Sequence, residues 1–158
     1  MGVLADDTAI EGGDGRYRAA LSRDWEIWGP NGGYVASIAL RAAGADTDLG
    51  DARPAALTCQ FLRTARFEPV DIEVVSLRRT RRAEAMRISI SQHGDAVLEA
   101  QVWAVGPNEG LVHDHEPIPD VGPPEATPTI EERIAALPEP PPRPPFKFWE
   151  NFEARPLK

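Results

Sequence analysis

The sequence has a single cysteine, Cys59, among its 158 residues. No intramolecular disulfide and no Cys-x-x-Cys pair can therefore form, which fits a reducing compartment. The sequence also lacks a long hydrophobic run, and its first residues lack basic charge, so we expect no signal peptide, no membrane span and a cytoplasmic location. Excess basic charge is missing too. The formal net charge of -8 argues against general binding to nucleic acid or to anionic membranes. Neither a G-x-S-x-G elbow nor a Walker loop is present.

Proline is rare in the first two thirds of the chain. Only three of the 16 prolines precede Gly106. We therefore predict a folded domain over residues 1–105 and a proline-rich, acidic linker over residues 106–145. The run Pro138–Pro145 favours polyproline II, which is typical of a semi-rigid spacer and less often of a ligand for a proline-binding module.

The last residues, 146–158, differ again, because they are rich in aromatic side chains. These are Phe146, Phe148, Trp149 and Phe152. Such a cluster favours burial. We predict either the start of a second repeat or an arm that docks on the folded domain or on a partner.

A glycine-rich turn, Trp28–Gly33, leads directly into the apolar stretch Tyr34–Ala43. This pattern predicts a buried helix over residues 33–43 that ends at Gly44. The first turn of such a helix has free N–H groups at the positive end of the helix dipole, which favours an anion or oxyanion site. The alternative is that Gly32 and Gly33 only allow tight packing.

The rest of the domain favours strands. Alternation of apolar and polar residues and flanking turn residues predict strands over residues 16–21, 55–65, 70–77, 86–91 and 97–105. The last two should form a hairpin around the turn Gln92–Asp95. One short strand, one buried helix and four strands predict an α+β fold, with an antiparallel sheet wrapped around the helix.

Several motifs occur in this order: Gly29-Pro-Asn-Gly-Gly-Tyr34, Phe61-Leu-Arg63, Val74-Val-Ser-Leu-Arg-Arg-Thr-Arg81 and Ile90-Ser-Gln-His-Gly94. Together they resemble the N-terminal repeat of the TesB-like acyl-CoA thioesterases, whose chains contain two hotdog repeats. The resemblance covers about residues 17–105. It implies one hotdog repeat, hydrolysis of acyl-CoA to a free acid and CoA, and no cofactor or metal.

The resemblance also implies a site. The backbone N–H groups of Gly32, Gly33 and Tyr34, with Asn31 beside them, would polarise the thioester carbonyl. The catalytic aspartate of the family lies in the second repeat, and the equivalent position here falls near Ala56. No Asp or Glu occurs between Ala52 and Phe67.

This repeat therefore resembles the non-catalytic half, unless Thr58, Gln60 and Gln101 orient a water. The alternative function is a non-catalytic acyl-CoA-binding or scaffolding half. A hydratase or dehydratase of the same fold would need a His and an acid at the helix start, and neither is evident. A lone repeat leaves a sheet edge unpaired, so we expect a homo-oligomer or a second repeat as partner.

Arginines form the second candidate site. Their planar donors suit phosphate, and CoA carries a 3′-phosphate and a diphosphate. We predict CoA binding by Arg63, Arg78, Arg79, Arg81 and Arg82. The alternative is an exposed strand edge on which charge prevents aggregation.

Other residues carry weaker signals. We predict a solvated loop and no metal site at His113–Glu116, and a small core residue at Cys59. We expect Trp25, Trp28 and Trp103 to cap the core or to line an acyl pocket.

Overall fold

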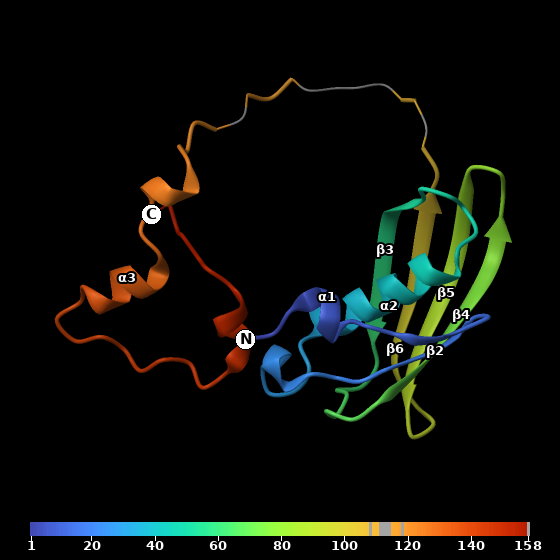
Figure 1. Cartoon of the computed structure of the whole chain (residues 1–158), viewed down its shortest axis with the longest axis horizontal. Helices are drawn as coiled ribbons and strands as arrows, with labels where there is room; N and C mark the ends of the chain where they lie inside the picture. Colours follow the sequence, from blue (N-terminus) through green and yellow to red (C-terminus); the bar gives the residue numbers. More distant parts are fainter. Residues whose placement is uncertain (108, 111–114, 118, 158) are drawn as a thin grey trace.

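A six-stranded antiparallel sheet curves around one long helix (Figure 1). The computed structural model describes residues 1–107, 109–110, 115–117 and 119–157. The strands are β1 (Glu11–Gly13), β2 (Arg16–Ala19), β3 (Arg53–Phe61), β4 (Val70–Arg79), β5 (Ala83–Gln92) and β6 (Asp95–Val105), in the sheet order β1-β2-β4-β5-β6-β3. The helices are α1 (Leu4–Asp7), α2 (Gly32–Asp46) and α3 (Ile130–Ala135), with 3₁₀ turns η1 (Arg23–Trp25), η2 (Pro124–Ala126) and η3 (Lys147–Asn151). The predicted α+β architecture, a sheet around a central helix, is confirmed.

Strand β5 shows why the sheet has a core face and an outer face. Met86, Ile88 and Ile90 are buried, whereas Arg87 between them is exposed. Successive side chains on a strand point to opposite faces, so this alternation places every second residue against the helix. The predicted hairpin with β6 is present, and its turn uses positive φ at His93 (54°) and Gly94 (84°).

Helix α2 packs on the concave face of the sheet, against β3, β4, β5 and β6. Ile38, Ala39 and Ala42 are fully buried, and the small alanines let the helix approach the strands closely. The predicted end at Gly44 is wrong, because the helix continues to Asp46. A glycine inside a helix costs about 1 kcal/mol. Hydrogen bonds hold the last turn and offset that cost: Asp46 Oδ1 accepts from the N–H of Gly15 (2.8 Å) and the hydroxyl of Tyr17 (3.1 Å), and Thr47 Oγ1 donates to Glu84 Oε2 (2.7 Å).

The strands also differ from the prediction in their bounds: the strand predicted over residues 16–21 ends at Ala19, and those predicted over 55–65, 70–77, 86–91 and 97–105 are β3, β4, β5 and β6 with the bounds given above. Strand β1 was not expected, because its three exposed residues include two glycines. Strand β3 ends at Phe61, four residues before the predicted end, because the following loop turns away. The side chain of the buried Gln92 holds that loop by hydrogen bonds to the backbone of the loop. Gln92 Oε1 accepts a hydrogen bond from the N–H of Arg66 (2.8 Å), and Nε2 donates to the carbonyl of Glu68 (3.1 Å).

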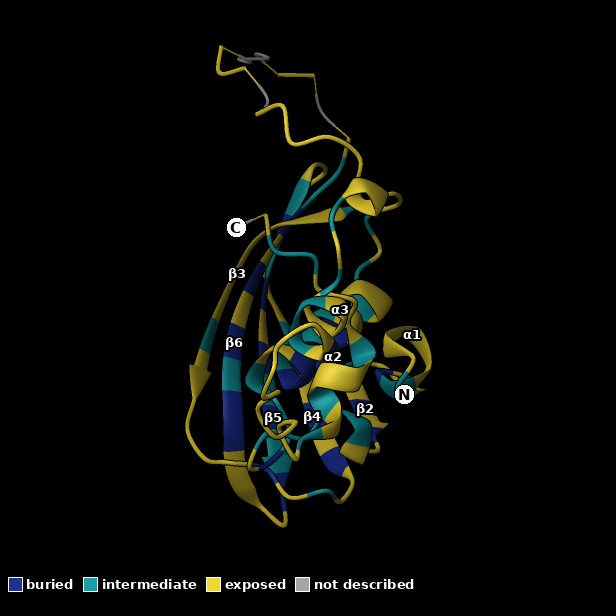
Figure 2. Cartoon of the chain, turned by 90° about the vertical axis from the view of Figure 1, so that its left-hand side faces the viewer, coloured by how far each residue is buried: buried dark blue, intermediate teal, exposed yellow. Residues whose placement is uncertain are grey.

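Strand β3 is the longer of the two edge strands of the sheet, and the other edge is the short strand β1. Strand β3 pairs with β6 alone, and eight of its nine residues are exposed (Figure 2). Apolar side chains at this edge, including Leu57 and Phe61, are 38% and 55% exposed. Cys59 lies between them and packs against the core, where burial raises the pKa of its thiol and disfavours the thiolate.

A fully buried carboxylate, Glu84, joins three elements. It accepts hydrogen bonds from Thr47 after α2 and from Ser76 on β4 (2.5 Å), and its Oε1 lies 2.8 Å from Arg79 Nη2. Burial acts to raise the pKa of Glu84, but the hydrogen bonds from Arg79, Ser76 and Thr47 outweigh it and lower the pKa below its ordinary value.

The C-terminal residues return to the N-terminal part of the domain. In Figure 1 helix α3 lies away from the sheet, and η3 lies close to the N-terminus. The amide side chain of Asn151 bonds to the Gly2 N–H (2.6 Å) and to the Asp24 carbonyl (2.7 Å).

The division into a domain, a linker over 106–145 and a segment over 146–158 stays a prediction. Within the described residues, no helix has both the length and the apolar character needed to cross a membrane.

The three tryptophans that were predicted to cap the core or to line an acyl pocket differ in burial. Trp25 is 6% exposed and belongs to the core, as predicted. Trp28 and Trp103 are 84% and 44% exposed, so the prediction that they cap the core is wrong, while a role in an acyl pocket stays a prediction. A positive φ of 56° turns Trp28 outward, and Trp103 lies on the outer face of β6, opposite Ala56 and Ala85.

Candidate active site

The start of α2 is the centre of the candidate site. Asn31 is its N-cap, and Oδ1 accepts hydrogen bonds from the N–H groups of Gly33 (2.9 Å) and Tyr34 (3.3 Å). These two predicted oxyanion donors are therefore occupied by the protein's own side chain. The N–H of Gly32 forms no hydrogen bond to any residue that the structure describes, so it is the donor that remains for a ligand.

The side chain of Tyr34 has a structural role. Its ring stacks on Trp25 with centroids 5.6 Å apart, and its hydroxyl donates to the Asp7 carbonyl (2.7 Å) and accepts from the Ser22 N–H (3.0 Å). Burial raises the pKa of this hydroxyl. Tyr34 thus fastens the helix start to the N-terminal residues and is neutral at ordinary pH.

A groove of ≈ 330 Å³ opens beside Gly32. Its walls are mostly apolar and come from α2, the end of β3, the loop after β3 and the start of β6. The lining residues are Pro30, Gly32, Val35, Phe61, Leu62, Arg63, Thr64, Ala65 and Val97. The ring of Phe61 lies against Gly32, where a Cβ atom would come within 3.2 Å of it. Among the residues that the structure describes, none that lines the groove carries a carboxylate, which agrees with the missing acid near Ala56.

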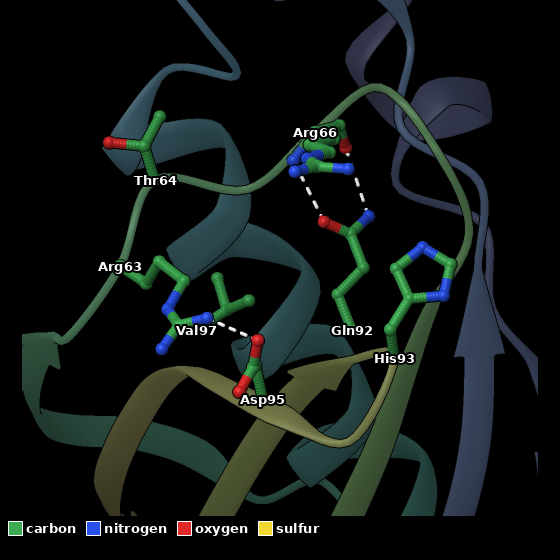
Figure 3. Close-up of a pocket in the computed structure, with 7 residues that line it drawn as sticks. All are labelled: Arg63, Thr64, Arg66, Gln92, His93, Asp95 and Val97. Atoms are coloured by element: carbon green, nitrogen blue, oxygen red, sulfur yellow. Dashed lines mark hydrogen bonds and ion pairs between the residues drawn. The ribbon is translucent and has the colours of Figure 1, made fainter.

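A second groove of ≈ 290 Å³ continues from the first, because both are lined by Arg63, Thr64 and Val97. We call it the polar groove, because its other lining residues are Arg66, Gln92, His93 and Asp95. Figure 3 shows Arg63 facing Asp95, with which it forms an ion pair, and Gln92 facing the backbone of Arg66. His93 also lines this groove and bonds to Glu68. That His–acid pair belongs to the β5–β6 turn and the loop before β4, not to the helix start.

The structure does not bring all five predicted arginines together, because Arg63 lies apart from the other four. Arg63 lies beside the β5–β6 turn, whereas Arg81 and Arg82 lie in the β4–β5 turn at the other end of the sheet. The 10 residues of β5 separate the two turns, which is about 30 Å at about 3.3 Å per residue. Arg79 is held by Glu84 and Asp48, and Arg78 lies opposite Ala85 on the outer face. Arg63 is therefore the predicted arginine that lies at the groove.

Two buried polar residues of β5 were not predicted from the sequence: Gln92, which lines the polar groove, and Glu84, which lies at the other end of the strand. A signal was present, because both occupy core-facing positions of β5, two residues before Met86 and two residues after Ile90. A polar residue at such a position needs partners, so the alternation marks it as a site of hydrogen bonding.

Of the predicted solvated loop His113–Glu116, His113 and Asp114 lie outside the described residues. Elsewhere in the part that is described, no three His, Cys, Asp or Glu side chains gather in a way that could hold a metal ion.

Solved structures share this fold over most of the chain. A protein of unknown function with a hot dog fold from Alicyclobacillus acidocaldarius has a TM-score of 0.78 at 24% identity, covering 95% of this chain and 53% of that one. A putative thioesterase II from Thermobifida fusca has a TM-score of 0.71 at 23% identity, covering 82% and 49%. An acyl-CoA thioesterase II, TesB2, from Mycobacterium marinum has a TM-score of 0.68 at 21% identity, covering 84% and 50%. The chain thus spans about half the length of these structures.

No curated protein matches the sequence significantly. The family model of the acyl-CoA thioesterase N-terminal domain, however, matches residues 21–105. That range contains α2, the strands β3 to β6 and both grooves. The predicted resemblance and the hotdog fold are confirmed. Because the match spans more than half of the chain, the chain belongs to the acyl-CoA thioesterase family, and residues 21–105 correspond to that family's N-terminal domain.

Proposed function

We propose that this chain binds acyl-CoA in the two connected grooves and takes part in hydrolysis of the thioester to a free acid and CoA. The observation that carries the proposal is the position of the apolar groove, which opens at the first turn of α2 beside the Gly32 N–H. Val35, Leu62 and Val97 offer an apolar wall to an acyl chain. The polar groove beyond Arg63 offers a cation to the phosphates of CoA.

In this proposal the Gly32 N–H donates to the thioester oxygen. Attack of water on the carbonyl carbon turns that oxygen into an oxyanion, and the CoA thiolate then leaves. A backbone donor at a helix start stabilises the oxyanion because the N–H is fixed in advance and the helix dipole is positive there. Asn31 acts on the same step indirectly, since its cap fixes the first turn.

The base that activates water comes, in our proposal, from outside this repeat. The polar side chains of the apolar groove belong to Arg63 and Thr64, and neither is a base near neutral pH. Asp95 is engaged by Arg63 in the neighbouring groove. A second repeat or another copy of the chain that pairs with the edge of β3 would bring its own carboxylate to the groove, because Phe61 belongs to both the edge and the groove.

The missing carboxylate favours a second candidate function. The chain would then bind acyl-CoA, or support a catalytic partner, without turning over substrate. The two functions differ in one measurable quantity, which is the release of free thiol by this chain.

The test is steady-state hydrolysis of a panel of saturated acyl-CoA thioesters with free-thiol detection, together with the molar mass in solution and the dissociation constant for CoA. Turnover by a defined oligomer supports hydrolysis. Binding without turnover supports the non-catalytic half, and absence of both overturns the proposal. Arg63→Ala should weaken CoA binding, while Arg87→Ala, which removes an exposed arginine from the outer face of β5, is the matched control.

The sheet edge has its own test. A lysine at an exposed edge position opposes strand pairing. Leu57→Lys should therefore lower the molar mass and the turnover together. Turnover that persists in a monomeric variant would argue against a base supplied across β3.

A further inference from the structure

The C-terminal residues 146–152, which we call the aromatic brace, contact the loop that leads into α2. Trp25 is held between two parts of the molecule. One face of its ring stacks on Tyr34 in the first turn of α2, with an interplanar angle of 10°. Phe148 and Phe152 of the brace contact the ring of Trp25 in edge-to-face geometry. Their ring centroids lie 6.3 Å and 6.0 Å from the centroid of Trp25. The brace thus completes the packing of a core residue.

Polar contacts fix the brace in place. Asn151 accepts a hydrogen bond from the Gly2 N–H (2.6 Å) and donates one to the Asp24 carbonyl (2.7 Å). Lys147 Nζ lies 3.6 Å from the Asp24 carboxylate. One amide side chain therefore joins the N-terminus, η1 and the brace, and it can do so in one orientation only.

The loop next to the brace carries the candidate site. The carbonyl of Trp25 accepts a hydrogen bond from the N–H of Asn31 (2.9 Å), and Asn31 caps α2. Trp25 thus contacts the brace through its ring and the helix cap through its backbone. Farther along the loop, the ring of Trp28 meets Phe146 with centroids 5.3 Å apart. Trp28 has a φ of 56°, a conformation that a bulky residue adopts only where its surroundings hold it.

We infer that the aromatic brace positions Asn31 and the Gly32 N–H through Trp25, so that Phe148 and Asn151 are positioning residues for the candidate site. The expected effect of the brace on acyl-CoA binding rests on the proposed function. The expected effect of the brace on the order of the helix start does not depend on any ligand. Without the brace, the loop over residues 25–30 keeps its attachment to α2 but loses the contacts that hold it from outside, and the helix start opens more often.

The test is amide hydrogen exchange of the full chain carrying Phe148→Ala. The inference predicts exchange over residues 26–34 that is faster by about tenfold, with no change over residues 83–105 of the sheet. Leu157→Ala removes an apolar side chain that is 60% exposed from the same C-terminal region, and it should leave both ranges unchanged. Phe148→Tyr keeps an aromatic edge against Trp25 and should restore protection. Faster exchange in residues 146–152 with no change in residues 26–34 would overturn the inference.

A second variant decides the result if Phe148→Ala accelerates exchange throughout the domain. Asn151→Ala removes two hydrogen bonds and no aromatic packing, and it should accelerate residues 26–34 and not the sheet. Unchanged exchange there would overturn the inference. Acyl-CoA binding is measured in parallel, with a dissociation constant that rises about tenfold in Phe148→Ala and returns in Phe148→Tyr. Absence of binding by the unmodified chain counts against the proposed function, whereas the exchange rates decide the role of the brace.

Discussion

Replacing Glu84 by alanine should be the most destabilising single change at the end of the sheet where the β4–β5 turn lies. Glu84 is fully buried, and its carboxylate accepts hydrogen bonds from Thr47 Oγ1 (2.7 Å) and Ser76 Oγ (2.5 Å). A hydrogen bond to a charged group contributes about 1.5–3 kcal/mol. Arg79 makes the strongest of the contacts that lower the pKa of Glu84, but solvent reduces what this contact contributes to stability, because the guanidinium is partly exposed and keeps Asp48 as a partner.

From these contacts we expect Glu84→Ala to lower the free energy of unfolding by about 3 kcal/mol, a large share of the 5–15 kcal/mol that is typical of a domain. Urea unfolding followed by circular dichroism measures the change. Glu73→Ala is the matched control, since Glu73 forms an exposed pair with Arg16 on the neighbouring strand. Its loss should cost less than about 1 kcal/mol. Equal effects of the two variants would refute the reasoning.

The same carboxylate predicts an acid dependence. The hydrogen bonds lower the pKa of Glu84 in the folded state below the value in the unfolded chain. A group with a depressed folded pKa stabilises the fold above its unfolded pKa, and that stability is lost as the pH falls through the folded pKa. The unmodified chain should therefore lose stability below about pH 4, and Glu84→Gln should lose less over that window. An identical acid dependence in both proteins would contradict the assignment.

Three further changes probe the helix cap and the grooves. Asn31→Ala should lower the free energy of unfolding by about 1 kcal/mol in urea, and Asn31→Ser should restore most of it, because serine is also a good N-cap; equal stability of the two variants would count against the cap. Arg63→Ala should change stability by less than about 1 kcal/mol, since its pair with Asp95 is exposed, while calorimetry should record weaker CoA binding that salt weakens further. Gln92→Leu should cost about 1–3 kcal/mol, because it leaves backbone groups of the loop after β3 without partners, and amide exchange over residues 62–69 should rise.

The sheet and the central helix were predictable because their signals are local. Alternation in β5 and β6, the turn at His93 and Gly94, and the apolar stretch after Gly33 each specify an element without knowledge of its neighbours. The ends of elements were not predictable in this way. Helix α2 passes through Gly44 because Thr47 is held by Glu84, a residue 37 positions away. Tertiary contacts of this kind override local preference.

The candidate site was predictable in its location and not in its donors. The glycine-rich turn indicates a helix start, but the sequence does not indicate that Asn31 turns back and occupies two of the three N–H groups. The separation of Arg63 from the other predicted arginines could not be seen in the sequence for a different reason. Arg63 and Arg81 are 18 positions apart, and the sheet places them at opposite ends because a complete strand lies between them. Clustering in sequence gives proximity in space only where the chain turns back between the residues.

The apolar groove lacks a base and a cover that excludes bulk water, both of which thioester hydrolysis needs. Both could be supplied at the edge of β3. It has no carboxylate among its lining residues, and its outer wall includes Phe61, which is 55% exposed on the edge strand. Hydrolysis requires a base and an environment that excludes bulk water. An element that pairs with β3 would cover Phe61 and bring its own side chains within reach of the groove, so a single pairing event would supply both. We therefore expect acyl-CoA turnover and coverage of the β3 edge to appear together or not at all.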